Sequence, residues 1–238
     1  MANRATFRQR FPGVSSILRN GALLTGTQWG ETGIRAVYAI LIGRLLGPDL
    51  YGAWSLALAT YAFAIGFTHF GLDSLVPLRL GRDKTAKTFI GTTFFVRLGL
   101  VVLAAIVTAI YILTFENDLF SRTALLIVLP ALVGRGIVLW SRSVFTGLES
   151  NRTALQFAVA LRFAELVIGL TCLWLGFGLY VLLAIHAATW VIEACLALVV
   201  LSRRTGFEIG FDGAEFRSWV ATTNPFDDRS TDGVELLS

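Results

Sequence analysis

Long apolar stretches recur along most of the chain, separated by short polar or glycine-rich turns. Each stretch has about 20 residues or more, the length a helix needs to cross the ~30 Å apolar core of a bilayer. Lipid offers no hydrogen-bond partners to an open backbone, so such stretches are expected to be helices. The pattern therefore predicts an all-α, polytopic membrane bundle of about six transmembrane helices, at residues 20–44, 50–72, 89–114, 123–146, 154–176 and 180–201.

Two more polar segments flank this six-span lobe, which occupies residues 20–205. Residues 1–19 are basic, and their apolar side chains are spaced so that a short helix would lie on the membrane surface. No cleavable signal peptide is expected, because the next apolar segment is too long for one. Residues 206–238 are polar and rich in Gly and Asp, so we expect a disordered cytoplasmic tail, with a brief amphipathic helix between Phe211 and Val220.

Lysine and arginine are unevenly distributed between the two sets of loops. If the N-terminus lies in the cytoplasm, the outside turns carry only Arg44 and Arg122, near their edges. The inside loops then carry Arg79, Arg82, Lys84, Lys87, Arg142, Arg152, Arg203 and Arg204. An excess of basic residues is typical of cytoplasmic loops. The charge pattern therefore predicts that the N-terminus and the C-terminus are both cytoplasmic.

Composition and motifs narrow the class further. The chain is 55% hydrophobic with a formal net charge of +4, which is typical of a membrane protein. Cys172 and Cys195 both lie in apolar segments and predict neither a disulfide nor a metal site. No phosphate-binding glycine loop, metal-spaced His/Cys cluster or nucleophile motif appears. We therefore expect a protein that is not an enzyme and that has no cofactor and no nucleic-acid partner.

Ionisable residues inside the predicted spans are the candidates for function, because charge is costly in lipid and normally faces a bundle interior or a water-filled cavity. Glu31 and Arg35 lie one turn apart, as do Arg162 and Glu165. Arg135 lies ~20 Å from the outer end of its span, near mid-membrane. We predict a net cationic cavity lined by Arg35, Arg97, Arg135 and Arg162, with Glu31, Glu165, His186 and Glu193 in ion coupling or structural pairing.

Simpler roles remain open for each of these residues. The two local pairs fit a purely structural function, in which they hold helices in register. Arg97 is close enough to the inner surface for its head group to reach water. His186 fits a hydrogen bond to a neighbouring helix equally well, and for Glu193 neither interpretation is favoured.

The turn between the first two spans has a distinctive amino-acid sequence. The stretch "GRLLGPDLYGAWSLALA", followed by "FGLDSLVPLRLGR", resembles the start of the polysaccharide biosynthesis flippases. These are the Wzx-like oligosaccharide flippases of the multidrug/oligosaccharidyl-lipid/polysaccharide exporter superfamily. The motif residues are Gly47, Pro48, Tyr51 and Gly52. Pro48 also gives the stretch a helix stop, since proline lacks a backbone donor. The resemblance covers about residues 15–205, including the loop "FTGLESNRTALQ".

The resemblance implies one lobe of a two-lobe bundle, shared with the related drug exporters, that works by alternating access. It implies a bacterial or archaeal cytoplasmic membrane and a polyprenyl-pyrophosphate-linked glycan as substrate, whose pyrophosphate enters the cationic cavity. The family pattern also implies a second lobe of similar size, so we expect a partner lobe or a homodimer. Two alternatives stay open: a multidrug/cation antiporter of the sister family, and a non-transporting remnant or membrane scaffold.

Overall fold

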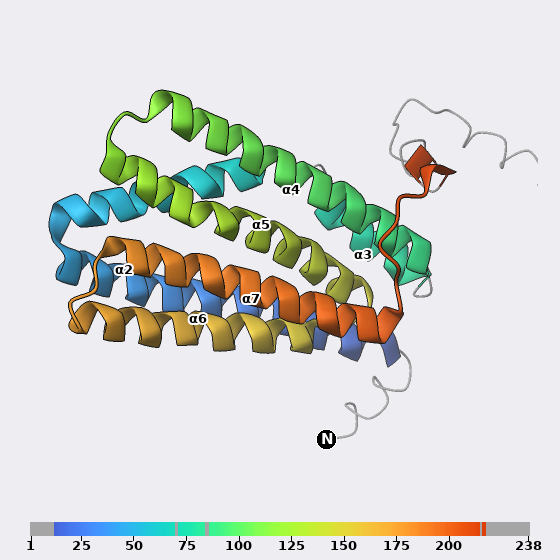
Figure 1. Ribbon diagram of the computed structural model, residues 1–238. Coiled ribbons are helices and arrows are strands. Elements are labelled where there is room, and N and C mark those ends of the chain that lie inside the picture. The colour runs from blue at the N-terminus through green and yellow to red at the C-terminus, as the bar shows by residue number, and fades with distance from the viewer. Residues whose placement is uncertain (1–11, 70, 84–85, 215, 218–238) are drawn as a thin grey trace, which may run out of the picture.

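The computed structural model describes residues 12–69, 71–83, 86–214 and 216–217, and in this part of the chain helices are the only regular secondary structure (Figure 1). Its helices are α2 (Pro12–Gly66), α3 (Leu72–Arg82), α4 (Lys87–Phe115), α5 (Leu119–Gly147), α6 (Asn151–Trp174) and α7 (Leu179–Thr205). The predicted all-α bundle is therefore confirmed. Of the predicted flanking segments, residues 1–11 and 218–238 lie outside the described residues, so only the last three residues of the candidate tail helix fall in these ranges.

Helix α2 contains the first two predicted spans, which meet at a sharp turn. Gly47 has φ 74° and ψ 173°, a backbone conformation that side chains exclude, and Pro48 follows it. The second segment then starts with the rest of the sequence motif. Tyr51 stacks on Trp54 with ring centroids 5.5 Å apart, and its ring lies over Gly43 of the first segment. The motif therefore forms the hairpin that the sequence predicted.

The second predicted span differs from the structure at its end. We expected one span over residues 50–72 and then a loop, whereas α2 ends at Gly66 and the short helix α3 continues to Arg82 along the same direction (Figure 1). Gly71, with φ 71°, allows the break between the two helices. The polar residues of α3 made this segment resemble a loop. The second pass of the chain is therefore a discontinuous helix.

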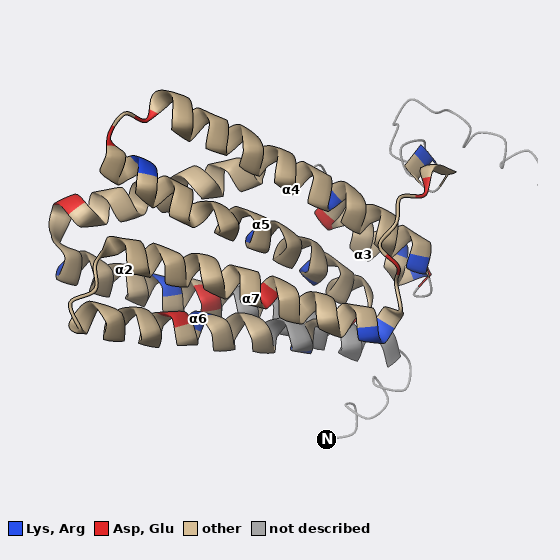
Figure 2. Ribbon diagram, viewed as in Figure 1, with Lys and Arg blue, Asp and Glu red and all other residues tan. Residues whose placement is uncertain are grey.

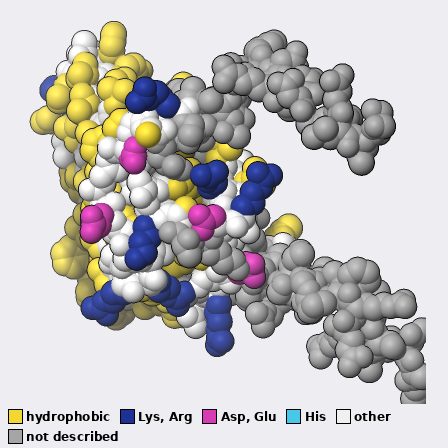
Figure 3. All heavy atoms as spheres, turned by 90° about the vertical axis from the view of Figure 1, so that its right-hand side faces the viewer, with side chains coloured by type: hydrophobic (Ala, Val, Ile, Leu, Met, Phe, Trp, Pro, Cys, Tyr) yellow, Lys and Arg dark blue, Asp and Glu magenta, His cyan; other side chains and the backbone are white. Residues whose placement is uncertain are grey.

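The other four predicted spans correspond to α4, α5, α6 and α7, within a few residues at each end. Each of these four helices is long and apolar enough to cross a membrane. With the two segments of α2, and with α3 extending the second, the described chain makes six antiparallel passes (Figure 1). We call the end of the bundle where α4 begins and α7 ends the basic end. Lysine and arginine residues gather there (Figure 2), and their side chains are visible on the face of the molecule at that end (Figure 3).

Helix α5 packs against every other described helix and forms the centre of the bundle. Close approach is possible because α5 has glycines at its contacts. A Cβ atom on Gly134 would lie 2.6 Å from the backbone of Trp190, and one on Gly136 would lie 2.4 Å from the side chain of Val101. Small residues allow such contacts in lipid, where helices gain no hydrophobic driving force from each other. The interior of the bundle therefore lies around α5.

The segment after α7 folds back onto the basic end. Phe207 is buried, with its ring 6.0 Å from that of Phe94 and 5.9 Å from that of Trp140. Further along, the amide of Asp212 donates to the hydroxyl of Thr92 on α4, at 3.2 Å. The described start of residues 206–238 thus packs on α4.

Candidate functional site

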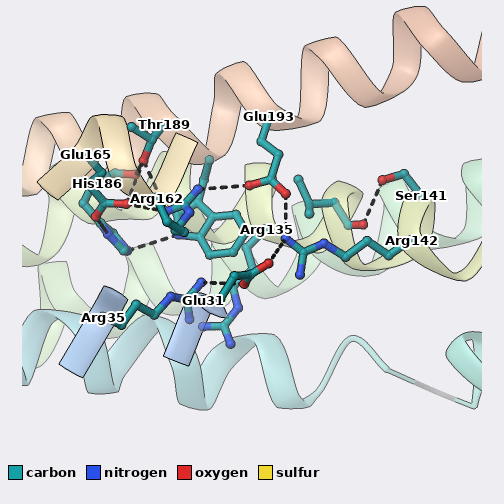
Figure 4. A network of polar contacts seen from close by, with 12 residues as sticks. Glu31, Arg35, Arg135, Ser141, Arg142, Arg162, Glu165, His186, Thr189 and Glu193 are labelled. Atoms are coloured by element: carbon teal, nitrogen blue, oxygen red, sulfur yellow. Dashed lines mark hydrogen bonds and ion pairs between the residues drawn. The ribbon is translucent and has the colours of Figure 1, made fainter. Parts of the chain in front are cut away.

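A cluster of charged side chains lies between α2, α5, α6 and α7 (Figure 4). It contains seven of the residues predicted from the sequence and one further arginine. Its members are Glu31 and Arg35 on α2, Arg135 and Arg142 on α5, Arg162 and Glu165 on α6, and His186 and Glu193 on α7. We refer to these eight residues as the central cluster.

The carboxylates of the central cluster bridge arginines on different helices. Glu193 lies 2.6 Å from Arg142 Nη2 with one oxygen and 3.0 Å from Arg162 Nη2 with the other. Arg142 also meets Glu31, at 2.8 Å, and Arg162 meets Glu165 on its own helix. Charge-assisted bonds of this kind are the strong ones. Two arginines and three glutamates thus join α2, α5, α6 and α7 into one ionic chain.

His186 has a defined tautomer, because the directions of its hydrogen bonds agree. The indole of Trp190 can only donate, so its bond of 3.2 Å makes His186 Nε2 an acceptor. The other ring nitrogen, Nδ1, therefore carries the proton and donates to Glu165 at 2.5 Å. The hydroxyl of Tyr61 lies 3.0 Å from Nε2 and accepts from Arg135 at 3.1 Å. The imidazole of His186 thus links Glu165 on α6 to Tyr61 on α2.

Three arginines surround the ring of Trp190. The guanidinium carbon lies 4.0 Å from the ring centroid for Arg162, 5.1 Å for Arg35 and 5.5 Å for Arg135. An aromatic face attracts cations at such distances, most strongly away from water. The indole is itself buried and fixed by its bond to His186. Trp190 therefore allows three like charges to approach one another.

The arginines of the central cluster are not equally neutralised. Arg142 and Arg162 each contact two carboxylates. Arg35 lies 3.6 Å from Glu31, a longer pair, and Arg135 donates to the hydroxyl of Tyr61. Within the described part of the chain, Arg135 pairs with no carboxylate. Its four arginines and three glutamates leave an excess of one positive charge, apart from His186, and this excess lies nearest Arg35 and Arg135.

The structure does not bring Arg97 into this cluster. Its side chain is fully buried and points to the break between α2 and α3. There it donates to the backbone oxygens of Thr68, at 2.5 Å, and Gly136, at 3.0 Å, and lies 3.9 Å from Asp73. Its head group therefore does not reach water, the alternative that its position had left open.

Sequence reasoning missed one member of the cluster, Arg142. Arg142 was assigned to an inside loop, but the structure places it on α5, with its side chain turned into the bundle. Its spacing of seven residues from Arg135 puts the two on one helix face, which was an available signal. Trp190 was also missed, although it lies one turn after His186 and three residues before Glu193.

Five members of the cluster are buried: Glu31, Arg162, Glu165, His186 and Glu193. A groove of about 760 Å³ lies between the second segment of α2 and α4, and its lining is mostly apolar and contains no residue of the cluster. Arg35, with a side chain 37% exposed, and Arg142, at 23%, give the cluster its contact with the surface. Within the described residues, no group of three or more His, Cys, Asp or Glu side chains could hold a metal ion.

These features define a polytopic helical membrane protein with a buried ionic network at its centre. The family model for polysaccharide biosynthesis proteins matches residues 17–227, so the chain belongs to that family. Members of this family are generally transporters rather than enzymes. No curated protein and no solved structure matches the chain. The family membership and the apolar helices together show a membrane protein of the transporter type.

Proposed function

We propose that this chain is one lobe of a flippase that moves a lipid-linked oligosaccharide across the cytoplasmic membrane of a bacterium or archaeon. The observation that supports this proposal is the uneven neutralisation of the central cluster. Arg35 and Arg135 approach one Trp190 ring, Arg35 with Glu31 at 3.6 Å and Arg135 with no carboxylate among the described residues, while Arg142 and Arg162 are each held by two glutamates. Two incompletely neutralised guanidinium groups beside an ionic chain are suited to bind a doubly charged pyrophosphate.

The pyrophosphate of a polyprenyl-linked glycan would bind to Arg35 and Arg135. Guanidinium groups present planar pairs of donors that match phosphate oxygens. The Nε atoms of both arginines are buried without a hydrogen-bond partner, so donors remain for such a ligand. Arg35 supplies the contact with the surface from which the ligand would enter. An organic cation fits less well, because Glu31, Glu165 and Glu193 all pair with arginines.

Alternating access requires a second lobe that moves against this one. We propose that a further lobe, from the same gene, a second polypeptide or a second copy of this chain, completes the transporter. The first segment of α2 supports such a contact, since it exposes the large apolar side chains Trp29, Val37 and Ile40. We also propose that the basic end faces the cytoplasm, in agreement with the positive charge there (Figure 3).

A direct test measures binding of undecaprenyl pyrophosphate to the purified protein in detergent by native mass spectrometry. Arg35→Gln and Arg135→Gln should each weaken binding about tenfold or more, since a hydrogen bond to a charged group contributes ~1.5–3 kcal/mol. Arg44→Gln, which removes an exposed arginine far from the cluster, serves as the matched control. Uncharged undecaprenol separates binding of the head group from binding of the tail. Equal pyrophosphate affinity in all four proteins would refute the proposed site.

A further inference from the structure

The break between α2 and α3 contains a second group of ionisable side chains, separate from the central cluster. His69 lies in the break and Asp73 lies in the first turn of α3. His69 Nδ1 and Asp73 Oδ2 form a short hydrogen bond. Arg97 faces the pair from α4, and the hydroxyl of Ser143 on α5 donates to Asp73 Oδ1 at 3.3 Å. Among the described residues, these are the charged and polar side chains recorded against Asp73.

The depth of this group makes it unusual. Arg97 lies ten residues after the start of α4, which is ~15 Å at 1.5 Å per residue. The break is therefore about a third of the way along α4, within the apolar thickness that the bundle spans. Intramembrane ionisable residues are costly, and non-helical backbone is tolerated there only where it is buried in protein or lines a cavity. His69 is nevertheless 46% exposed on its side chain, and Asp73 is 30% exposed.

One guanidinium nitrogen of Arg97 lies close to both Thr68 and Asp73. Nη1 donates to the backbone oxygen of Thr68, at 2.5 Å, and lies 3.9 Å from Asp73 Oδ2. The Thr68 oxygen lies in the turn that follows the end of α2 at Gly66. The same Asp73 oxygen is held by His69. The carboxylate therefore lies between two donors, and its position decides how strongly Arg97 can hold the end of α2.

We propose that His69 and Asp73 form a proton-binding site that controls the break between α2 and α3. Imidazole is the side chain that ordinarily changes charge near neutral pH. With Nδ1–H bonded to Asp73, a proton from water adds to Nε2 and gives an imidazolium that holds the carboxylate. Loss of that proton weakens the hold, and Asp73 moves toward Arg97. Arg97 then shares its donor with the carboxylate, and the Thr68 carbonyl is released.

This site goes beyond the proposed transport of a lipid-linked glycan, and its test requires no transported substrate. The chain has two histidines, so histidine labelled with ¹⁵N gives NMR signals from His69 and His186 alone. We expect the imidazole signal that is lost in His69→Gln to change with pH. Asp73→Asn should lower the midpoint of that change, since an opposite charge within 4–6 Å favours the charged form. An unchanged His186 signal reports an intact fold.

The link to the break is measured with a single cysteine. Ser74→Cys places a thiol at an exposed position in the first turn of α3, in a protein whose Cys172 and Cys195 are replaced by alanine. We divide its rate of maleimide labelling by the rate of the same cysteine in His69→Gln. This ratio cancels the pH dependence of the reagent itself. We expect this ratio to rise with pH at the NMR midpoint. A His69 that does not titrate, a midpoint unmoved by Asp73→Asn, or a flat labelling ratio would each overturn the proposal.

Discussion

The central carboxylate of the ionic chain offers the most stringent test of the structure. Glu193→Gln keeps the size of the side chain and removes its charge. The glutamate is 3% exposed on its side chain and bridges Arg142 and Arg162, at 2.6 and 3.0 Å. After the substitution, one amide oxygen can still accept from one arginine, but the amide nitrogen faces the other. Two cations on different helices therefore lose a shared anion in the bundle interior.

The size of this effect follows from burial. Removing one partner of a buried ion pair costs ~3–5 kcal/mol, because it leaves an uncompensated charge. Arg162 keeps Glu165 and Arg142 keeps Glu31, so we expect a value near the lower limit. A loss of ~3 kcal/mol reduces the ratio of folded to unfolded protein about a hundredfold. An isolated surface pair would contribute ~1 kcal/mol at most.

Unfolding by SDS in mixed micelles, followed by tryptophan fluorescence, measures this loss, since the ring of Trp190 lies beside Arg162. Glu208→Gln, the same change at an exposed glutamate, should be neutral to within ~0.5 kcal/mol. Arg142→Gln combined with Glu193→Gln should cost less than the sum of the two single changes, because the pair is already broken. Wild-type stability in Glu193→Gln, or strict additivity in the double variant, would refute the ionic chain.

Three further predictions concern the backbone. Gly134→Ala forces α5 away from Trp190 and should cost ~1–3 kcal/mol, whereas Gly99→Ala, with open space around it, should be neutral or stabilising in thermal unfolding. Gly47→Ala should also cost ~1–3 kcal/mol in that assay, because of its positive φ. Hydrogen bonds from amides of the first turn of α5 lower the pKa of Asp118, so its stabilising effect exists above the ordinary carboxyl range. The difference between Asp118→Ala and wild type should therefore vanish as the pH falls below that range.

Local chemistry explains which parts of the fold could be predicted from the sequence. The lengths of the apolar stretches and the Gly47–Pro48 turn were sufficient for six passes and the first hairpin. The pairs Glu31–Arg35 and Arg162–Glu165 followed from helical spacing. Such features depend on residues a few positions apart, so a single sequence contains their whole signal.

The contacts between helices could not be predicted in the same way. Arg142 and Glu193 are 51 residues apart, and their contact depends on how α5 and α7 are rotated about their axes. In a membrane both the core and the lipid-facing side of a helix are apolar, so hydrophobicity marks that rotation poorly. The prediction therefore grouped Arg97 with the other arginines and left Arg142 in a loop. The break after Gly66 was missed because the polar residues of α3 had already suggested a loop.

Two neighbouring residues of α5 connect the central cluster to the break in the second pass. Arg135 donates to the hydroxyl of Tyr61, which contacts His186, while the next carbonyl, that of Gly136, accepts from Arg97. Tyr61 lies in the last turns of α2, and Thr68 follows in the turn just after the helix ends at Gly66. Release of Thr68 by Arg97 would thus free the same segment that positions Tyr61 against Arg135. If Arg135 binds the pyrophosphate and the break responds to protons, the second segment of α2 is the element through which one event would affect the other.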